Sequence, residues 1–310
     1  MLNPRIYKEL YIISRPRQWT KNLLIFAASL FTFKFDLLSW TLSTKAFICF
    51  CLISSSVYTL NDILDVEADK KHESKKFRPI ASGRLPLRIA FIYCLILTSL
   101  SLLLSVFINK LLFFIVLGYF LVQVAYCLIL KKQPILDIFC IAFGFILRAL
   151  AGLIFTDVLP SHWFILSIGF LALFLAIEKR KAELRISLNT GVLARKVLMR
   201  YSLPLLQRLE SIVACSAFMT YTLWSSGPSL NGAGTSWMLL SVPFVLVGIF
   251  RYQLLSDPDE FERRKINFPN RTTESPEEIL LEDNGIRLCI IGWLITVLII
   301  GISNKYSLIL

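Results

Sequence analysis

The sequence predicts an all-α integral membrane protein with nine transmembrane helices. Three observations lead to this fold class. The 310 residues are 56% hydrophobic and have a mean hydropathy of +0.67, which exceeds what a soluble domain needs to fill its core. Apolar stretches of roughly 20 residues, long enough to cross the hydrocarbon of a bilayer, recur along the chain. Lys and Arg residues gather in alternate connections between these stretches, as expected for a multi-pass protein.

The nine apolar stretches follow one another from the N-terminal region to the C-terminal region. The first is the least regular, because its apolar centre from Leu23 to Phe33 is short and its start is charged. The others are apolar over a full membrane crossing. The nine predicted spans lie near 20–37, 43–61, 88–108, 111–130, 135–156, 161–178, 209–226, 236–254 and 286–303.

The positive charges predict how the chain is oriented. With the N-terminus inside, 28 of the 33 Lys and Arg residues fall in inner segments, and short loops rich in these residues stay in the cytoplasm. We therefore expect a cytoplasmic N-terminus, an outside C-terminus and cytoplasmic loops at about 61–88, 178–208 and 255–285. The net charge of +12 then reflects membrane orientation and not nucleic-acid binding. One membrane domain covering 1–310 is the expected organisation.

The stretch "NDILDVEADKKHESKKFRP" after the second span is the main candidate for a functional site. On a helix that continues through Asp69, Asn61, Asp65 and Asp69 recur at every fourth residue and Asp62 lies seven residues before Asp69, so these groups share one broad face. Like charges on one face repel and require a cation. Oxygen ligands suit Mg²⁺, which proteins usually hold with one or two carboxylates and substrate phosphates. A solvated helix end is the alternative interpretation.

Basic residues follow these carboxylates directly and include Lys76 and Arg78. A diphosphate that touches a metal ion on one side and cations on the other fits this order. Ordinary juxtamembrane lysines are the alternative for Lys70 and Lys71.

The end of the sixth span carries a second charged segment. It contains Glu178, Lys179, Arg180 and Glu183. Lys179 and Glu183 are also spaced for a salt bridge within one helix, so either a binding role or a structural pair is open for this segment.

Two further sets of polar residues lie near predicted inner ends of spans. Lys21 and Asn22 lie where the first span meets the cytoplasm, and an interfacial anchor around Trp19 is the alternative account of that stretch. Asp137 lies near the inner end of the fifth span, with Arg148 three turns deeper on nearly the same face. A guanidinium at this depth needs an anion, carbonyl dipoles or a wet cavity. Arg148 is therefore either a ligand-binding residue or a buried structural tie.

The segment "NDILDVEAD" followed by "KKFRPIASG" resembles the first aspartate-rich motif of the UbiA superfamily of intramembrane prenyltransferases. The resemblance implies a helical bundle with a central cavity, cytoplasmic loops that cap the site, Mg²⁺ as cofactor, and a diphosphate donor bound at the cytoplasmic side. Carried over by position, Asn61, Asp65 and Asp69 would bind the metal, with Lys76 and Arg78 binding phosphate.

Three more stretches, "RPRQWTKNLLIFA", "PILDIFCIAFGFILRALAG" and "PEEILLEDN", are similar to the decaprenyl-phosphate phosphoribosyltransferase branch of that superfamily. The position of the usual second aspartate-rich segment reads "EKRKAE", which departs from the ordinary prenyltransferases. The branch resemblance implies phosphoribosyl diphosphate as donor and polyprenyl phosphate as acceptor.

The implied reaction is Mg-dependent transfer of a 5-phosphoribosyl group to a decaprenyl-type phosphate with release of diphosphate. The acceptor oxygen is already anionic, so it can attack C1 of the ribose without a general base. Asp65, Asp69 and Arg78 are expected to act in catalysis by stabilising charge on the leaving diphosphate. The expected metal set is Asn61, Asp62, Asp65 and Asp69, and the expected substrate-binding set is Lys21, Asn22, Lys76, Asp137, Arg148, Lys179, Arg180 and Glu183.

Other functions remain open from the sequence. A prenyltransferase that joins a polyprenyl diphosphate to an aromatic acceptor would use the same metal motif. A transporter would use Asp137 and Arg148 for translocation, although the charges cluster on one membrane face and not at a midplane between repeats. A purely structural protein leaves the aligned carboxylates unexplained. The expected surroundings are the lipid bilayer of a bacterial inner membrane, without nucleic acid, and a homo-oligomer is left open.

Overall fold

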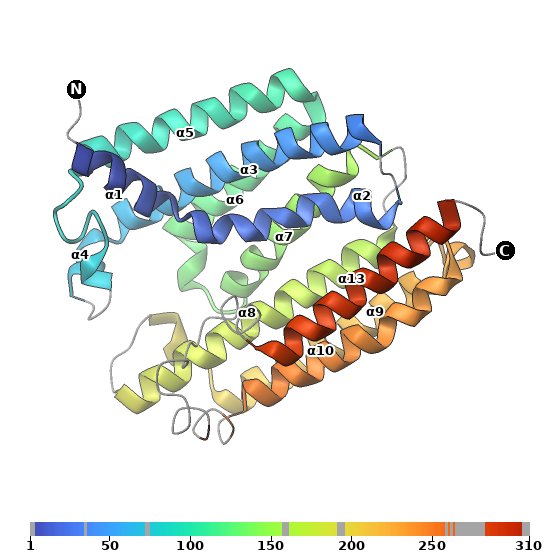
Figure 1. Cartoon of the computed structure of the whole chain (residues 1–310). Coiled ribbons are helices and arrows are strands. Elements are labelled where there is room, and N and C mark those ends of the chain that lie inside the picture. Colours follow the sequence, from blue (N-terminus) through green and yellow to red (C-terminus); the bar gives the residue numbers. More distant parts are fainter. Residues whose placement is uncertain are drawn as a thin grey trace. The chain divides into compact units, whose positions relative to one another are not determined.

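The computed structural model describes residues 4–33, 36–71, 75–156, 161–190, 196–257, 260, 263 and 283–305. All regular elements in these ranges are helices, as the sequence predicts (Figure 1). The chain forms two compact units: unit 1 comprises residues 1–30 and 34–158, and unit 2 comprises residues 31–33 and 159–310.

Unit 1 is built around the long helix α3 (Leu37–Leu64), which contacts every other long element of the unit. Asp36 begins this helix because its side chain accepts a hydrogen bond from the Ser39 amide at 2.8 Å. The partners of α3 are η1 (Pro16–Phe26, a 3₁₀ helix), α5 (Leu87–Ile108), α6 (Lys110–Leu128) and α7 (Leu136–Leu153).

Small residues let α3 and α5 approach closely. Ser56 Oγ donates to the Cys94 carbonyl at 3.0 Å, and Ser101 Oγ donates to the Cys49 carbonyl at 2.8 Å. Small polar side chains of this kind are typical of helix contacts in membranes. The apolar core around them includes Ile25, Phe50, Ile53, Leu112, Val116 and Leu147.

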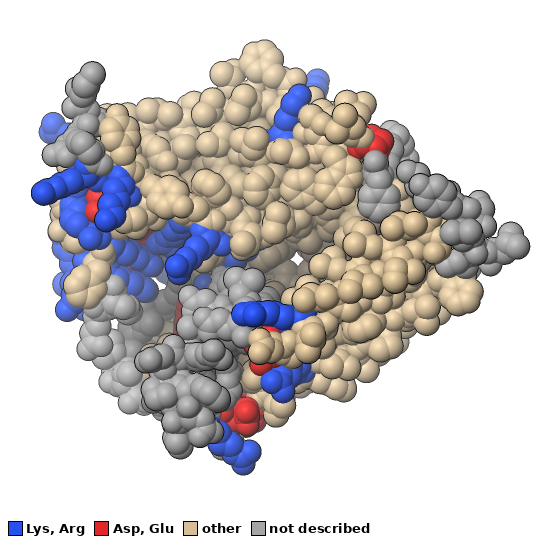
Figure 2. All heavy atoms as spheres, in the orientation of Figure 1, with Lys and Arg blue, Asp and Glu red and all other residues tan. Residues whose placement is uncertain are grey.

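The outer face of α5 consists of large apolar side chains that are about half exposed, among them Phe91, Leu95 and Leu103. In Figure 2 most Lys and Arg side chains of unit 1 gather over the end that carries α1 (Pro4–Ser14) and α4 (Val66–Lys70), whereas the visible face of its long helices is mostly free of charge. An apolar girdle with a charged end is the surface that a bilayer requires.

The first predicted span is not a continuous α-helix. Residues 20–37 are divided between η1 and the short helix α2 (Ala27–Phe31). η1 lies so close to α7 that a β-carbon at Gly152 would collide with the Ile25 carbonyl. This close approach places the C-terminal part of η1 against the C-terminal end of α7.

The described residues of unit 2 form three long helices in sequence and a fourth near the C-terminal end. The helix α8 (His162–Thr190) packs along α9 (Leu203–Ser225), and α9 in turn contacts α10 (Val242–Leu255), which packs against α13 (Asn284–Lys305). The helix α8 continues 12 residues beyond the end of the span predicted over 161–178.

Seven helices in the described part of the chain are long and apolar enough to cross a membrane, so the predicted count of nine is not confirmed. The two predicted spans outside this set are 20–37 and 209–226. The first is broken into two short helices. The second lies in α9, where Arg208, Glu210 and several Ser and Thr residues reduce the hydropathy.

Candidate active site

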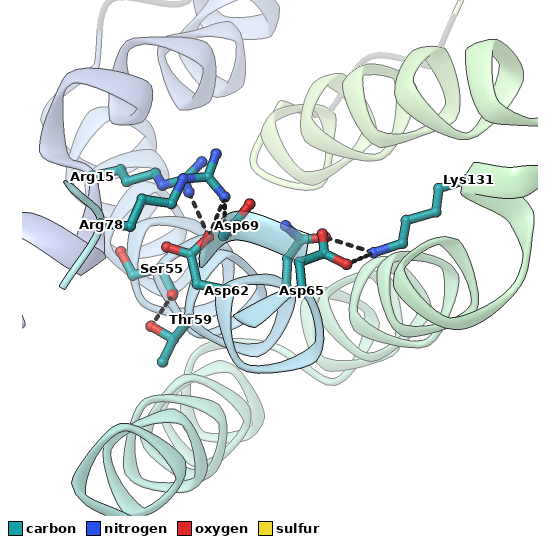
Figure 3. A network of polar contacts seen from close by, with 9 residues as sticks. Arg15, Ser55, Thr59, Asp62, Asp65, Asp69, Arg78 and Lys131 are labelled. Carbon is teal, nitrogen blue, oxygen red and sulfur yellow. Dashed lines mark hydrogen bonds and ion pairs between the residues drawn. The ribbon is translucent and has the colours of Figure 1, made fainter. Parts of the chain in front are cut away.

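The helix α3 ends at Leu64, and α4 (Val66–Lys70) begins after the single residue Asp65. The Asp65 amide still bonds to the Asn61 carbonyl at 3.0 Å, but the backbone of Asp65 (φ −95°, ψ 5°) has left helical geometry. The continuous helix predicted through Asp69 is therefore interrupted at Asp65. As a result, the predicted row of ligands separates into two groups (Figure 3).

The first group is the carboxylate–guanidinium cluster, which comprises Arg15, Asp62, Asp69 and Arg78. Asp62 Oδ1 accepts hydrogen bonds from Arg15 Nη2 at 2.6 Å and from Arg78 Nη1 at 3.0 Å. Arg78 Nη1 also donates to Asp69 Oδ2 at 2.7 Å. Both carboxylates are buried, whereas the Arg15 and Arg78 side chains are 29% and 25% exposed. Because each buried carboxylate is paired with a cation, the cluster is balanced in charge.

Both arginines of this cluster come from segments outside α3. Arg15 lies between α1 and η1 in a left-handed conformation (φ 51°, ψ 60°), and its guanidinium lies 5.2 Å from the centre of the Tyr58 ring. Arg78 follows the 3₁₀ turn η2 (Lys75–Phe77). Because a non-glycine residue rarely adopts positive φ, the turn at Arg15 is a specific feature that delivers this side chain to Asp62.

The second group is the Lys131 group, which comprises Asn61, Asp65 and Lys131. Lys131 Nζ donates to Asp65 Oδ1 at 2.6 Å and to Asn61 Oδ1 at 3.3 Å. Lys131 belongs to the 3₁₀ turn η3 (Leu130–Lys132) between α6 and α7. Its side chain is 13% exposed and that of Asp65 is 31% exposed, so this ion pair borders on solvent.

The two groups offer the oxygen donors that Mg²⁺ prefers, but they do not form a complete cage. Within the described ranges, no set of three or more His, Cys, Asp or Glu side chains is arranged to hold a metal ion. In the carboxylate–guanidinium cluster, arginines already bind both carboxylates. In the Lys131 group, the Oδ1 atoms of Asn61 and Asp65 converge on one cation. That pair fits part of a magnesium site, because Mg²⁺ commonly takes one or two protein ligands and completes its shell with water and substrate phosphate.

Arg148 is buried in unit 1 and ties three elements together. Its Nε donates to Asn22 Oδ1 of η1 at 2.7 Å, Nη2 donates to the Tyr119 hydroxyl of α6 at 2.9 Å, and Nη1 donates to the Gly144 carbonyl of α7 at 2.8 Å. The guanidinium also lies 4.7 Å from the centre of the Tyr119 ring. These contacts satisfy the buried charge with dipoles and an aromatic face, as expected for a structural tie.

Unit 2 contains a second charged network at the α8, α9 and α10 contact. Lys181 Nζ donates to Glu178 Oε1 of the same helix at 2.7 Å and makes a short hydrogen bond to Glu210 Oε2 of α9. Gln253 of α10 donates to the other Glu210 oxygen at 3.0 Å. Lys181, Glu178 and Glu210 are at least nine-tenths buried. We call these four residues the Lys181 network.

The remaining predicted residues have different environments. Arg180 is fully buried and its Nη1 donates to Glu183 Oε2 at 2.6 Å. Lys76 is exposed, with Nζ 5.3 Å from the centre of the Phe77 ring, and does not join the carboxylates. Asp137 is fully buried in the first turn of α7. Lys21 and Lys179 are half-buried, and most of the loop predicted at about 255–285 lies outside the described residues.

Glu67 of α4 pairs with neither group. It is exposed and accepts a hydrogen bond from Lys70 at 2.7 Å, which lowers the pKa of its carboxyl group. It is therefore an ordinary solvated ion pair two residues from Asp65.

The sequence did not predict several of the contacts that the structure forms in these groups. Arg15 and Lys131 lie 47 and 66 residues from their partners Asp62 and Asp65, so no local periodicity links them. Glu210 likewise joins Lys181 across 29 residues. Of these contacts, the sequence could have predicted only the pairing of Lys181 with Glu178, because the two residues are three positions apart on one helix face.

Apolar helices with carboxylates and cations at the end of a central helix indicate an enzyme that is embedded in the membrane and has a charged site at one end. The sequence model of the UbiA prenyltransferase family matches residues 22–270. The chain therefore belongs to this family and is an integral membrane transferase.

Within this family, several relatives with a described activity match most of the chain. The chain is 34% identical over 296 residues to a decaprenyl-phosphate phosphoribosyltransferase of Mycolicibacterium smegmatis, covering 91% of this chain and 89% of that protein. It is 34% identical over 286 residues to the protein of the same description from Corynebacterium glutamicum, covering 90% and 82%. A solved UbiA homologue from Archaeoglobus fulgidus bound to GPP and Mg²⁺ matches with a TM-score of 0.67 at 19% identity, covering 93% of this chain and 99% of that one. The last comparison confirms the fold.

Proposed function

We propose that this chain transfers a 5-phosphoribosyl group from phosphoribosyl diphosphate to a polyprenyl phosphate and releases diphosphate. The observation that carries the proposal is its one-third identity, over about nine-tenths of the chain, to relatives described as decaprenyl-phosphate phosphoribosyltransferases. The charged groups at the end of α3 suit any diphosphate leaving group, so the choice of donor depends on these relatives.

In the proposed reaction, the bond between C1 of the ribose and the diphosphate oxygen breaks, and a phosphate oxygen of the lipid forms the new bond to C1. The attacking oxygen is anionic at neutral pH, so no side chain has to remove a proton from it. Negative charge develops on the diphosphate as it leaves. Preorganised positive charge beside the leaving group lowers the barrier, because it needs no reorganisation during the reaction.

Arg78 is the residue we assign to this charge stabilisation. Its guanidinium is anchored by Asp62 and Asp69, yet a quarter of the side chain is exposed. A guanidinium presents several donors in a fixed plane that matches phosphate oxygens, so donors not used on the carboxylates remain for a substrate. Asp62 and Asp69 then act by positioning Arg78.

Asn61 and Asp65 are the residues that would hold Mg²⁺, since their oxygens converge on one cation position. When bound, the ion would supply Lewis-acid stabilisation of the diphosphate. Substrate binding by Lys21, Arg148, Lys179 and Arg180, and the cytoplasmic orientation of the N-terminus, are proposals that rest on the sequence.

The proposal is tested by offering two donors to the purified full chain in detergent. One reaction contains decaprenyl phosphate with radiolabelled phosphoribosyl diphosphate, and the other contains an aromatic acceptor with a radiolabelled prenyl diphosphate, both with Mg²⁺. We expect label in the lipid product of the first reaction only. Label transferred only in the second reaction would contradict the proposal in favour of a conventional prenyltransferase. The matched controls are Asp65→Asn, expected to be inactive, and Glu67→Gln, expected to be active.

A further inference from the structure

Lys131 occupies the position from which Asn61 and Asp65 would bind a divalent cation. Its Nζ lies within hydrogen-bond distance of both Oδ1 atoms, at 3.3 and 2.6 Å (Figure 3). An ammonium and a metal ion that share the same two oxygens would lie about 4 Å apart, where like charges repel strongly even at the surface of a protein. The two cations therefore exclude one another.

The backbone that carries Lys131 is held in place, so any exchange must come from its side chain. The Lys132 amide bonds to the Ile129 carbonyl at 3.1 Å and the Gln133 amide bonds to the Leu130 carbonyl at 3.0 Å. A tight γ-turn follows, in which the Leu136 amide bonds to the Pro134 carbonyl at 2.8 Å. The four-carbon stem of a lysine can swing its ammonium without any of these bonds breaking.

The charge around Asp65 makes this exchange depend on the substrate. Asp65 is 31% exposed, so water can hydrate its carboxylate while the cations change places. A metal ion that arrives alone has to displace Lys131 and leaves the ammonium close to an added double positive charge. A metal ion that arrives with a diphosphate brings negative charge that can bind the displaced ammonium. Metal binding is then favoured when the phosphate substrate comes with it.

We propose that Lys131 is a resident counter-cation of the Asn61–Asp65 pair, displaced by the divalent metal, so that this pair binds metal weakly alone and tightly together with a diphosphate. This inference rests on the proposed function, because it takes Asn61 and Asp65 as the metal-holding residues. It assigns Lys131 a positioning role in which its charge sets the order of binding.

The test is a titration of Mn²⁺, which prefers the same oxygen ligands as Mg²⁺, into the purified full chain, with free Mn²⁺ measured by its electron paramagnetic resonance signal. Without diphosphate, Lys131→Gln should lower the Kd for Mn²⁺ about tenfold or more, because the competing charge is gone. Lys131→Arg, which keeps the charge, should stay within about twofold of the unaltered chain. Lys132→Gln, which alters the next lysine of the same turn, is the matched control and should also stay within about twofold.

Inorganic diphosphate provides the second arm of the test. It should tighten Mn²⁺ binding to the unaltered chain more than to Lys131→Gln, because only the former has an ammonium to transfer. Thermal unfolding of each variant establishes that it is folded, and Lys131→Met is the substitute if the glutamine variant is not.

Two results separate failure of this inference from failure of the proposed function. Mn²⁺ binding that is lost in Asp65→Asn but unchanged in Lys131→Gln would overturn the role of Lys131 and leave the metal assignment intact. Absence of Asp65-dependent Mn²⁺ binding in every variant, with and without diphosphate, would overturn both.

Discussion

In unit 1 and unit 2, the cations that bind carboxylates come from different kinds of segment. At the end of α3, every cation comes from a turn or a loop: Arg15 from the turn before η1, Arg78 from the segment after η2, and Lys131 from η3. In unit 2, Lys181 binds one glutamate of its own helix and one of the neighbouring helix. The cations of unit 1 therefore come from connections between helices, whereas Lys181 lies within the contact of two packed helices.

The exposed fractions of the charged side chains also differ between the two regions. Asp65 and Arg78 are 31% and 25% exposed, while Lys181 and Glu178 are 6% and 2% exposed. An ion pair at the border of solvent can exchange its partner for a substrate or a metal ion. A fully buried pair cannot lose a partner without leaving an uncompensated charge. We therefore interpret the groups of unit 1 as functional and the Lys181 network as structural.

The largest effect is expected for Lys181→Met. This change leaves Glu178 and Glu210 buried without their shared cation, and breaking a buried pair costs about 3–5 kcal/mol. We expect a large fall in the thermal unfolding temperature of the purified protein, or loss of folded protein from membranes. The triple variant Glu178→Gln, Lys181→Met, Glu210→Gln removes all three charges and should recover much of the loss. A melting temperature of Lys181→Met equal to that of the unaltered chain would mean that the network is dispensable.

Asp65→Asn is expected to reduce activity strongly and to change stability little, in contrast to Lys181→Met. Transfer activity should fall about 100-fold or more, the size of effect seen when a preorganised charge is removed from a reaction site. The free energy of unfolding should change by about 1 kcal/mol or less, because ion pairs open to solvent contribute little to stability. Initial rates with phosphoribosyl diphosphate, measured beside thermal unfolding, check both parts. A stability loss equal to that of Lys181→Met would remove the distinction between the two regions.

The sequence predicted the all-helical membrane fold and the segment that carries the site, because both depend on local signals. Apolar length identifies spans such as α5 and α6, and the spacing of Asn61, Asp65 and Asp69 identifies a polar helix end. The helix break at Asp65 was missed, since no Gly or Pro marks it. The predicted spans 20–37 and 209–226 are not confirmed, because the first is divided between two short helices and the second carries polar residues.

The partners of the carboxylates could not be predicted from spacing. Lys131 contacts Asp65 only because α6 packs beside α3, and Arg15 reaches Asp62 only because the chain turns through a left-handed residue. Contacts of this kind follow from tertiary packing. The family resemblance supplied the chemistry, and the structure supplied the pairing that divides the predicted ligands into two groups.

Arg148→Lys tests whether a charged residue acts in stability because it is buried, whichever unit it belongs to. Arg148 lies in unit 1 but is buried like Lys181, and lysine cannot reach Asn22, Tyr119 and Gly144 at once. Losing one or two buried hydrogen bonds should cost about 1–3 kcal/mol, measured as a fall in unfolding temperature. An unchanged stability with a raised KM for the donor would instead identify Arg148 as a substrate-binding residue.

Glu67→Gln is expected to have the smallest effect. Because Lys70 lowers the pKa of Glu67, this pair can add to stability only at pH values where the carboxyl is ionised, and its contribution disappears as the pH falls through the lowered pKa. Glu67 is exposed, so we expect no measurable change in melting temperature or transfer rate at neutral pH. A clear loss of activity would extend the functional region to Glu67 and its exposed ion pair.

The central claim is that Asn61 and Asp65, at the end of α3, form the exchangeable cation site. The position of a bound metal ion tests this claim most directly. Crystals of the full chain soaked with Mn²⁺ and diphosphate would reveal the ion by its anomalous scattering. We predict a peak at direct coordination distance from the Oδ1 atoms of Asn61 and Asp65, with the Lys131 ammonium moved away from both. A peak between Glu178 and Glu210 with Lys181 displaced, and none at Asp65, would contradict the assignment of the exchangeable site to the end of α3.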